Sequence, residues 1–120
     1  MIKFVMCLRR HPDLSREEFQ RYWRHEHAPL FNSFADTHHA KRYVQDHTIE
    51  SPVNEMLQES RGMLEAFDGV AEVWFESEEA FAEAMSSEAG QKLGAVLHED
   101  ESRFIDHARS TAFLAREVEV

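Results

Sequence analysis

The sequence predicts a single α+β domain spanning residues 1–120, with elements in the order β-α-β-β-α-β. Segments rich in β-forming residues alternate with segments of helical spacing, and no linker or internal repeat divides the chain. A chain of 120 residues can bury one hydrophobic core. Hydrophobic residues make up 42% of the chain and charged residues 30%, which is typical of a globular protein.

The first strand is expected at Ile2–Leu8, because this segment is rich in β-forming residues and is apolar on both alternating faces. Cys7, the only cysteine, lies inside it and is expected to pack as a small hydrophobic side chain. A helix should begin after Ser15, since Ser15 and Glu18 have the spacing of a capping box.

Apolar and aromatic residues at helical spacing continue along this helix through Phe19, Tyr22, Trp23, His27, Leu30 and Phe34. His27 lies one turn beyond Trp23 and should face the sheet, whereas His25 points about 160° away. Pro29 removes a backbone donor and disfavours helix at the residue before it, so the helix is expected to kink or stop near Ala28. This places His27 near a helix end.

The second strand is expected at Lys41–Ile49, with Tyr43, Gln45, His47 and Ile49 on one face and Arg42, Val44, Asp46 and Thr48 on the other. This polar mixture is typical of a strand that lines a cavity. Residues 51–66 are spaced for at most a short helix or a partly mobile flap. The turn pair Asp68-Gly69 precedes a third strand at Val70–Phe75, which carries Glu72 in its middle.

Two helical segments are expected next, at 77–86 and from Ser87 towards Ile105, with a bend near Ser86 and Ser87, and a final strand at 110–120. This order of elements is that of the ferredoxin-like fold, an antiparallel sheet with helices on one face only. Because three of the predicted strands are apolar on both faces, the open face needs a partner, and a second copy of the chain is the simplest one. We therefore expect a homodimer.

Charge and composition narrow the partners. Lys and Arg number 13 against 23 Asp and Glu, a formal charge of −10, so nucleic acid is not expected as a partner. The acidic residues at 76–79 and 99–101 are expected to lie in solvent, at helix starts and turns. The apolar N-terminal run is too short for a membrane span or a signal peptide, so we expect no membrane association and a cytoplasmic location.

Five segments in order resemble the EthD family: IKFVMCLRR, FQRYWRHEHAPL, KRYVQDHT, DGVAEVWF and EDESRFID. The resemblance spans nearly the whole chain. It implies a dimeric α+β barrel, in which two ferredoxin-like sheets pack face to face. The family it resembles includes proteins associated with ether degradation and relatives that act as polyketide cyclases, muconolactone-type isomerases and cofactor-independent oxygenases. The implied ligand is a small aromatic, polyketide or lactone compound.

The resemblance also implies catalytic residues. The family's functional histidine at the end of the first helix matches His27, and pocket-lining positions of cyclase and isomerase relatives match Arg42, Tyr43 and His47. An imidazole can exchange a proton with a carbon acid or a phenol, and a phenol can stabilise an enolate oxygen. By strand alternation Arg42 faces away from Tyr43, so we favour Tyr43 and His47 over Arg42. The predicted catalytic residues are therefore His27, Tyr43 and His47.

The predicted substrate-binding residues are Trp23, Phe31, Arg42, Phe67, Glu72 and Trp74. For the aromatic residues, simple core packing is the alternative. A carboxylate within an apolar strand needs a partner, so Glu72 is expected to bond Arg42 or a histidine, and a structural ion pair at the dimer interface is favoured over a general base.

We predict no metal and no cofactor. His25 and His27 diverge on a helix and cannot bind one ion, and the HExxH, CxxC, phosphate-loop and GxSxG motifs are absent. The further histidines His38, His39, His98 and His107 match no functional position of the family. Two functions stay open: a cofactor-independent cyclase, isomerase or oxygenase, and a non-catalytic small-molecule-binding or accessory dimer. Haem binding, a third alternative, would produce a Soret band.

Overall fold

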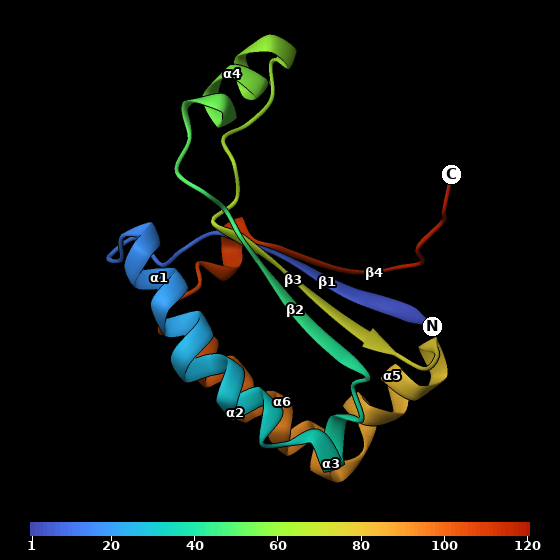
Figure 1. Cartoon of the computed structure of the whole chain (residues 1–120). Coiled ribbons are helices and arrows are strands. Elements are labelled where there is room, and N and C mark those ends of the chain that lie inside the picture. The colour runs from blue at the N-terminus through green and yellow to red at the C-terminus, as the bar shows by residue number, and fades with distance from the viewer.

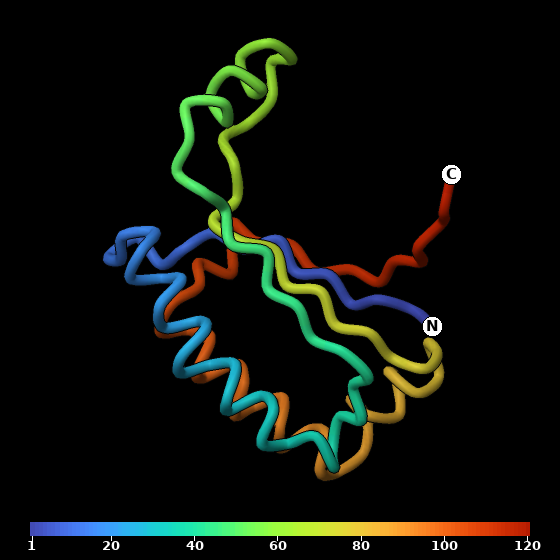
Figure 2. The backbone as a smooth tube through the Cα atoms, viewed as in Figure 1, coloured from blue at the N-terminus to red at the C-terminus, as the bar shows by residue number.

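The computed structural model describes all 120 residues and contains a four-stranded antiparallel sheet. Its strands are β1 (Ile2–Leu8), β2 (Arg42–His47), β3 (Gly69–Phe75) and β4 (Thr111–Ala115), in the spatial order β2-β3-β1-β4. The pairs β1–β3, β1–β4 and β2–β3 are all antiparallel. This confirms the predicted ferredoxin-like fold, and both chain termini lie at the same end of the sheet (Figure 2).

Helices cover one face of the sheet (Figure 1). They are α1 (Arg16–Tyr22), α2 (Ala28–Asn32) and α3 (Ala35–His38) between β1 and β2, and α5 (Glu78–Ser86) and α6 (Glu88–Glu101) after β3. A 3₁₀ turn, η2 (His107–Arg109), leads from α6 towards β4. No helix combines the length and the apolar character that a membrane span requires.

Serine side chains begin three of these helices. Ser15 accepts a bond from the Glu18 backbone N–H while the Glu18 side chain accepts one from Ser15, so the predicted capping box is confirmed. Ser77 and Ser87 cap α5 and α6, and the chain bends between these helices as expected. The crossing is close, because a Cβ on Gly90 would lie 1.8 Å from the carbonyl oxygen of Ala84.

Of the two outcomes expected near Ala28, a kink or a stop, the stop does not occur. A π-helical turn, η1 (Trp23–His27), joins α1 to α2, and the Ala28 backbone N–H reaches the carbonyl of Trp23. Pro29 falls in the first turn of α2, where its missing N–H costs no helical hydrogen bond. His27 therefore lies within a continuous helical path rather than at its end.

Residues 51–66, for which we expected at most a short helix or a flap, lie in a projecting arm. Within it, α4 (Pro52–Arg61) begins at the capping residue Ser51 and ends at Gly62, whose φ is 63°. The arm stands away from the sheet and the other helices (Figure 1) and exposes large apolar side chains: Ile49, Val53, Met56, Leu57, Met63 and Leu64. None of these side chains borders the cavity described below, so the arm does not cover it.

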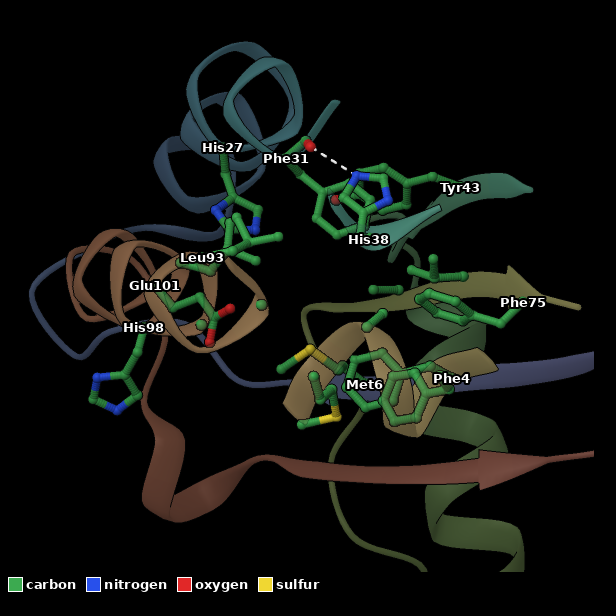
Figure 3. Close-up of a pocket in the computed structure, with 18 of the residues that line it drawn as sticks. Phe4, Met6, His27, Phe31, His38, Tyr43, Phe75, Leu93, His98 and Glu101 are labelled. Carbon is green, nitrogen blue, oxygen red and sulfur yellow. Dashed lines mark hydrogen bonds between the residues drawn. The ribbon is translucent and has the colours of Figure 1, made fainter. Parts of the chain in front are cut away.

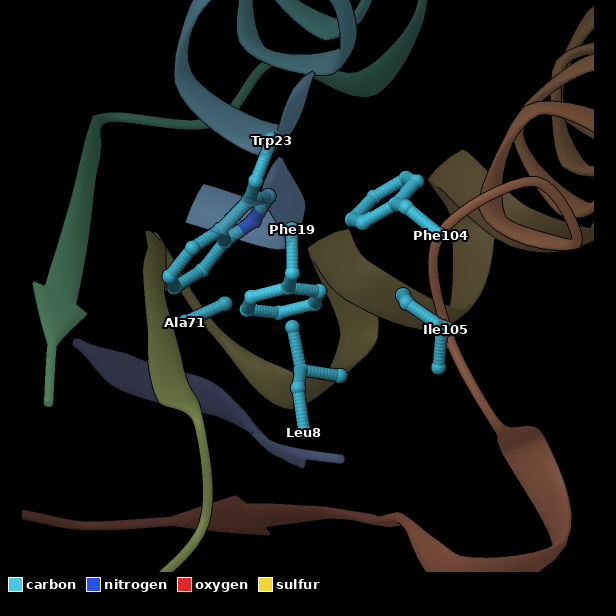
Figure 4. Close-up of a cluster of buried hydrophobic side chains, with 6 residues drawn as sticks. All are labelled: Leu8, Phe19, Trp23, Ala71, Phe104 and Ile105. Carbon is cyan, nitrogen blue, oxygen red and sulfur yellow. The ribbon is translucent and has the colours of Figure 1, made fainter. Parts of the chain in front are cut away.

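A cluster of buried hydrophobic side chains joins the helices to one end of the sheet (Figure 4); its members are Leu8, Phe19, Trp23, Ala71, Phe104 and Ile105. The rings of Phe19 and Phe104 are 5.6 Å apart, and both residues are fully buried. Burying one such side chain contributes about 1.5–3 kcal/mol. The cluster therefore fixes α1 and the segment after α6 against β1 and β3.

The opposite face of the sheet carries no helix. On β3 the side chains alternate between buried positions under the helices and half-buried positions on this open face, which are those of Val70, Glu72 and Trp74. Glu72 pairs with Lys3 at 2.8 Å, not with Arg42 or a histidine as expected. The register explains this, because Lys3 is the diagonal neighbour of Glu72 on β1.

Asp46 and the stacked pair Arg42 and Trp74 also lie on the open face, near this ion pair. Arg42 stacks on the ring of Trp74, its partner in the register, at 4.6 Å. A hydrogen bond with Glu72, together with burial, raises the pKa of Asp46 to about 6. The open face therefore combines apolar side chains with a compact charged group.

Candidate functional site

A cavity of about 310 Å³ lies between the helices and the sheet (Figure 3). Side chains of β1 and β3 form its floor, and Phe81, Leu93 and Leu97 contribute from α5 and α6. The bordering side chains that carry a polar group are those of His27, His38, Tyr43, His98 and Glu101. Cavities of this size, mostly apolar with a few polar groups, are typical of small-molecule sites.

His27 reaches the cavity from η1 and is 7% exposed. Its Nδ1 donates a hydrogen bond of 2.8 Å to Oδ2 of Asp100, because an ionised carboxylate can only accept. In the neutral form of the ring, Nε2, which forms no hydrogen bond within the chain, is the nitrogen without a proton. A histidine held in this way by a carboxylate has the arrangement of a general base.

Asp100 is the residue that sequence analysis missed. It is buried, and its Oδ1 accepts a 2.5 Å bond from the hydroxyl of Tyr22 and lies 3.8 Å from the guanidinium of Arg103. Burial and the bond to Asp100 raise the pKa of Tyr22, so its hydroxyl stays protonated as a donor. The expectation that residues 99–101 lie in solvent at a turn is wrong for Asp100 and for Glu101, because the last turn of α6 directs Asp100 inwards and Glu101 borders the cavity.

Tyr43 borders the cavity from β2, and its hydroxyl accepts a 2.8 Å bond from Nε2 of Gln45. Burial raises the pKa of Tyr43, while bonds from Gln45 and Trp23 oppose that rise. The hydroxyl therefore keeps its own proton at neutral pH. It is placed to donate that proton in a hydrogen bond to a ligand oxygen.

His47, the third predicted catalytic residue, does not border the cavity. It stacks on Trp23 at 4.8 Å, and its Nε2 donates a 2.8 Å bond to Oε1 of Gln45. Burial, aided by the charge of Arg24, lowers the pKa of His47. Gln45 thus bonds both His47 and Tyr43. Strand alternation placed Gln45 on the same face as these two residues, but nothing in the sequence indicated a role for it.

The predicted substrate-binding residues divide between the two faces of the sheet. Trp23 and Phe31 border the cavity. Arg42, Glu72 and Trp74 lie on the open face instead, as the alternation of β2 and β3 requires. Phe67 lies away from the cavity beneath the guanidinium of Arg9, at 4.2 Å.

The other histidines have separate surroundings. His38 is buried at the cavity wall, where Nε2 donates to the carbonyl of Phe31 and Nδ1 accepts from the backbone of Ala40. Burial is the main cause that lowers the pKa of His38. His98 is exposed and stacks on His107 at 4.8 Å. No group of three or more His, Cys, Asp or Glu side chains has an arrangement that could hold a metal ion.

Comparison with known proteins gives a family match and several structural matches. A family model described as the EthD domain matches residues 11–108. An EthD family protein of Bacillus halodurans has a TM-score of 0.64 and 19% identity, over 98% of this chain and 99% of that chain. A protein of Arabidopsis thaliana has a TM-score of 0.63 and 15% identity, over 100% and 98%.

A third solved structure is described as a dimeric protein of unknown function and ferredoxin-like fold from Bacteroides fragilis. Its TM-score is 0.60 and its identity 6%, over 97% of this chain and 95% of that chain. No curated protein matches the chain in sequence. At such identities the likeness to solved structures shows a shared fold.

Proposed function

The chain belongs to the EthD domain family, and from that premise we propose that it is a cofactor-independent acid–base enzyme acting on a small aromatic, polyketide or lactone compound. The observation that carries the proposal is the pairing of His27 with Asp100 at the wall of the cavity, at 2.8 Å. The carboxylate fixes the orientation and tautomer of the imidazole. Nε2 is then free to act as the base.

In the proposed reaction Nε2 of His27 removes a proton from a carbon next to a carbonyl group, or from a phenol. Asp100 stabilises the imidazolium that forms, and Tyr22 holds Asp100 from its other side. The electron pair moves to the substrate oxygen, to which the hydroxyl of Tyr43 donates a hydrogen bond. Returning the proton to a different atom completes an isomerisation or follows a ring closure, with no oxidant consumed.

Deuterium exchange tests this role on any carbon acid that the cavity admits. A panel of cyclic 1,3-diketones and aryl ketones is incubated with the protein in D₂O, and loss of the proton next to the carbonyl is followed by NMR. We expect His27→Ala to slow the catalysed exchange about 100-fold or more and Asp100→Asn to slow it about tenfold. His25→Ala, at an exposed position in the same turn, is the control. Equal rates for His27→Ala and the unaltered protein would refute the proposal.

A second candidate function is non-catalytic binding of a small apolar molecule. It is favoured by the composition of the cavity, where 15 of the 21 bordering residues are hydrophobic. Ligands that raise the melting temperature of the protein but undergo neither exchange nor conversion would support it over the enzyme.

The proposal includes a homodimer that packs through the open face of the sheet. It is supported by the half-buried apolar side chains on that face and by the dimeric description of the Bacteroides fragilis relative. A second sheet laid on this face would cover Val44, Val70 and Trp74 and leave the cavity on the far side of each sheet.

A further inference from the structure

The polar groups of the cavity differ in what they offer to a ligand. Both ring nitrogens of His38 form hydrogen bonds within the chain, so His38 has no donor or acceptor available for a ligand. His27 offers one acceptor, Nε2, and Tyr43 offers one donor, its hydroxyl. The proposed reaction uses neither of the other two groups, which are His98, whose ring stacks on His107, and Glu101, the only carboxylate among the bordering residues.

Glu101 is the last residue of α6 and turns towards the cavity (Figure 3). Asp100 beside it forms its hydrogen bond with His27 instead. Its side chain is 16% exposed, and its Oε1 accepts a 3.0 Å bond from Nε2 of His107. Oε2 forms no hydrogen bond within the chain. The charge of Glu101 also acts on the cavity wall, because together with burial it raises the pKa of Tyr43.

The cavity therefore has a negative charge at any pH at which its histidines are neutral. Glu101 borders it directly, Asp100 stands behind His27, and no Lys or Arg is among the bordering residues. A ligand carboxylate that enters the cavity is repelled by these negative charges and loses much of its hydration, so its binding is unfavourable. An O–H group meets an ionised acceptor, which forms the stronger kind of hydrogen bond.

We infer that Glu101 determines ligand specificity: the cavity takes an uncharged aromatic molecule whose hydroxyl group donates to Glu101, and it rejects a carboxylate of the same shape. The inference rests on the proposed function for the location of the site, but it does not require turnover. The volume of about 310 Å³ fits a molecule of two fused rings, since an apolar cavity of about 150 Å³ holds benzene.

Three probes of one shape test this: 2-naphthol, its methyl ether and 2-naphthoate. Their affinities are measured by calorimetry at about pH 8, where most histidines are neutral and naphthoate is ionised. We expect naphthol to bind at least about tenfold more tightly than the ether, which cannot donate, and than the carboxylate. Failure of all three probes to bind, or naphthoate binding as tightly as naphthol, overturns the inference.

Substitution at Glu101 locates the selectivity. Glu101→Gln removes the charge and keeps the shape, so naphthoate should gain about tenfold in affinity and the preference for naphthol over naphthoate should nearly disappear. The matched control is Glu99→Gln, which removes the same charge two residues earlier from a side chain that is 79% exposed and does not border the cavity. Its preference should stay within about twofold of that of the unaltered protein.

Two results separate this inference from the proposed function. An unchanged preference in Glu101→Gln, or an equal change in Glu99→Gln, overturns the role of Glu101 whatever the exchange assay shows. His27→Ala should lose exchange and still prefer naphthol over naphthoate, because Glu101 is intact. Should Glu101→Gln not fold, Glu101→Ala is measured in its place and must show the same loss of preference.

Discussion

Asp68, which lies where the projecting arm joins the sheet, accepts hydrogen bonds from three donor groups. It accepts bonds of 2.7 Å from the backbone N–H of Arg10, 2.7 Å from the guanidinium of Arg10 and 2.9 Å from Nε of Arg16. Burial by itself would raise the pKa of this carboxyl, but the bonds from Arg10 and Arg16 outweigh it and lower the pKa. Asp68 thus connects the loop after β1, the start of α1 and the turn before β3.

Asp68→Asn should lower the free energy of unfolding at neutral pH by about 2 kcal/mol, because two guanidinium groups lose their counter-charge. A carboxyl whose pKa is lowered by folding stabilises the protein above its ordinary pKa, and this contribution is lost as the pH falls through the lowered value. Urea unfolding should therefore show a gap between the two proteins that narrows towards acid. A gap that stays constant with pH would contradict this assignment.

The control for Asp68 is Asp13→Asn. The Asp13 side chain is 88% exposed and lies 3.8 Å from His11. Exposed charge pairs of this kind contribute little, so its stability should change by less than about 0.5 kcal/mol.

At the scale of single residues, the sequence predicted the positions of His27 and Tyr43 at the cavity but not that of Asp100. Asp100 lies in a run of acidic residues between Glu99 and Glu101, and nothing in that run distinguishes a buried acid from an exposed one. Its spacing from Leu93 and Leu97 placed it on the inner side of α6, yet spacing alone does not show that a histidine lies opposite. That pairing depends on two helices meeting.

Among the elements, α6 carries two glycines four residues apart with opposite surroundings. Both border the cavity, but a Cβ on Gly94 would meet nothing within 4 Å, whereas a Cβ on Gly90 would collide with the Ala84 backbone. Close packing of α5 against α6 therefore requires glycine at position 90, whereas glycine at position 94 leaves open space.

Gly94→Ala should raise the free energy of unfolding by about 0.5–1 kcal/mol, because alanine favours a helix over glycine and the site has room. Gly90→Ala should lower it by about 2 kcal/mol or more, since α5 and α6 must separate. Chemical denaturation of the two variants provides the comparison, and changes of the same sign in both would contradict it.

The elements were largely predictable where local chemistry decides them. Ser15, Ser77 and Ser87 begin helices because a hydroxyl can bond the free N–H groups of a first turn. The course of the chain at Pro29 was not predictable, because a π-helical turn is a tertiary compromise without a sequence signal of its own. The arm was not predictable either, since nothing in its spacing shows that it leaves the body of the domain.

For the whole molecule, the proposed dimer predicts a solution mass of about twice the 14.0 kDa of one chain. Val44 lies on the open face beside Glu72 in the register, so Val44→Asp would place a third carboxylate near Glu72 and Asp46. We expect this variant to be monomeric by light scattering while its circular dichroism is retained. A monomeric unaltered protein would contradict the dimer, as would a dimeric Val44→Asp variant.

The control is Ala82→Asp, which adds the same charge at an exposed position of α5 on the helical side of the molecule. It should remain a dimer.

The architecture of a single chain followed from the order of its elements, whereas the way two chains meet depends on the open face as a surface, with its ion pair and its stacked Arg42. The order of elements does not contain that information.

The π-helical turn determines which changes in the length of the first helix the fold can absorb. A turn of this kind holds one residue more than a regular one, so deleting one of the exposed residues 24–26 would restore a uniform helix and leave Phe19 and Phe31 on their present faces. Adding a residue to the regular helix on either side would instead rotate one half against the other by about 100°. Phe19 could then keep its place in the core only if Phe31 left the cavity. Evolutionary or laboratory variants of this segment should therefore tolerate the loss of one residue better than the gain of one.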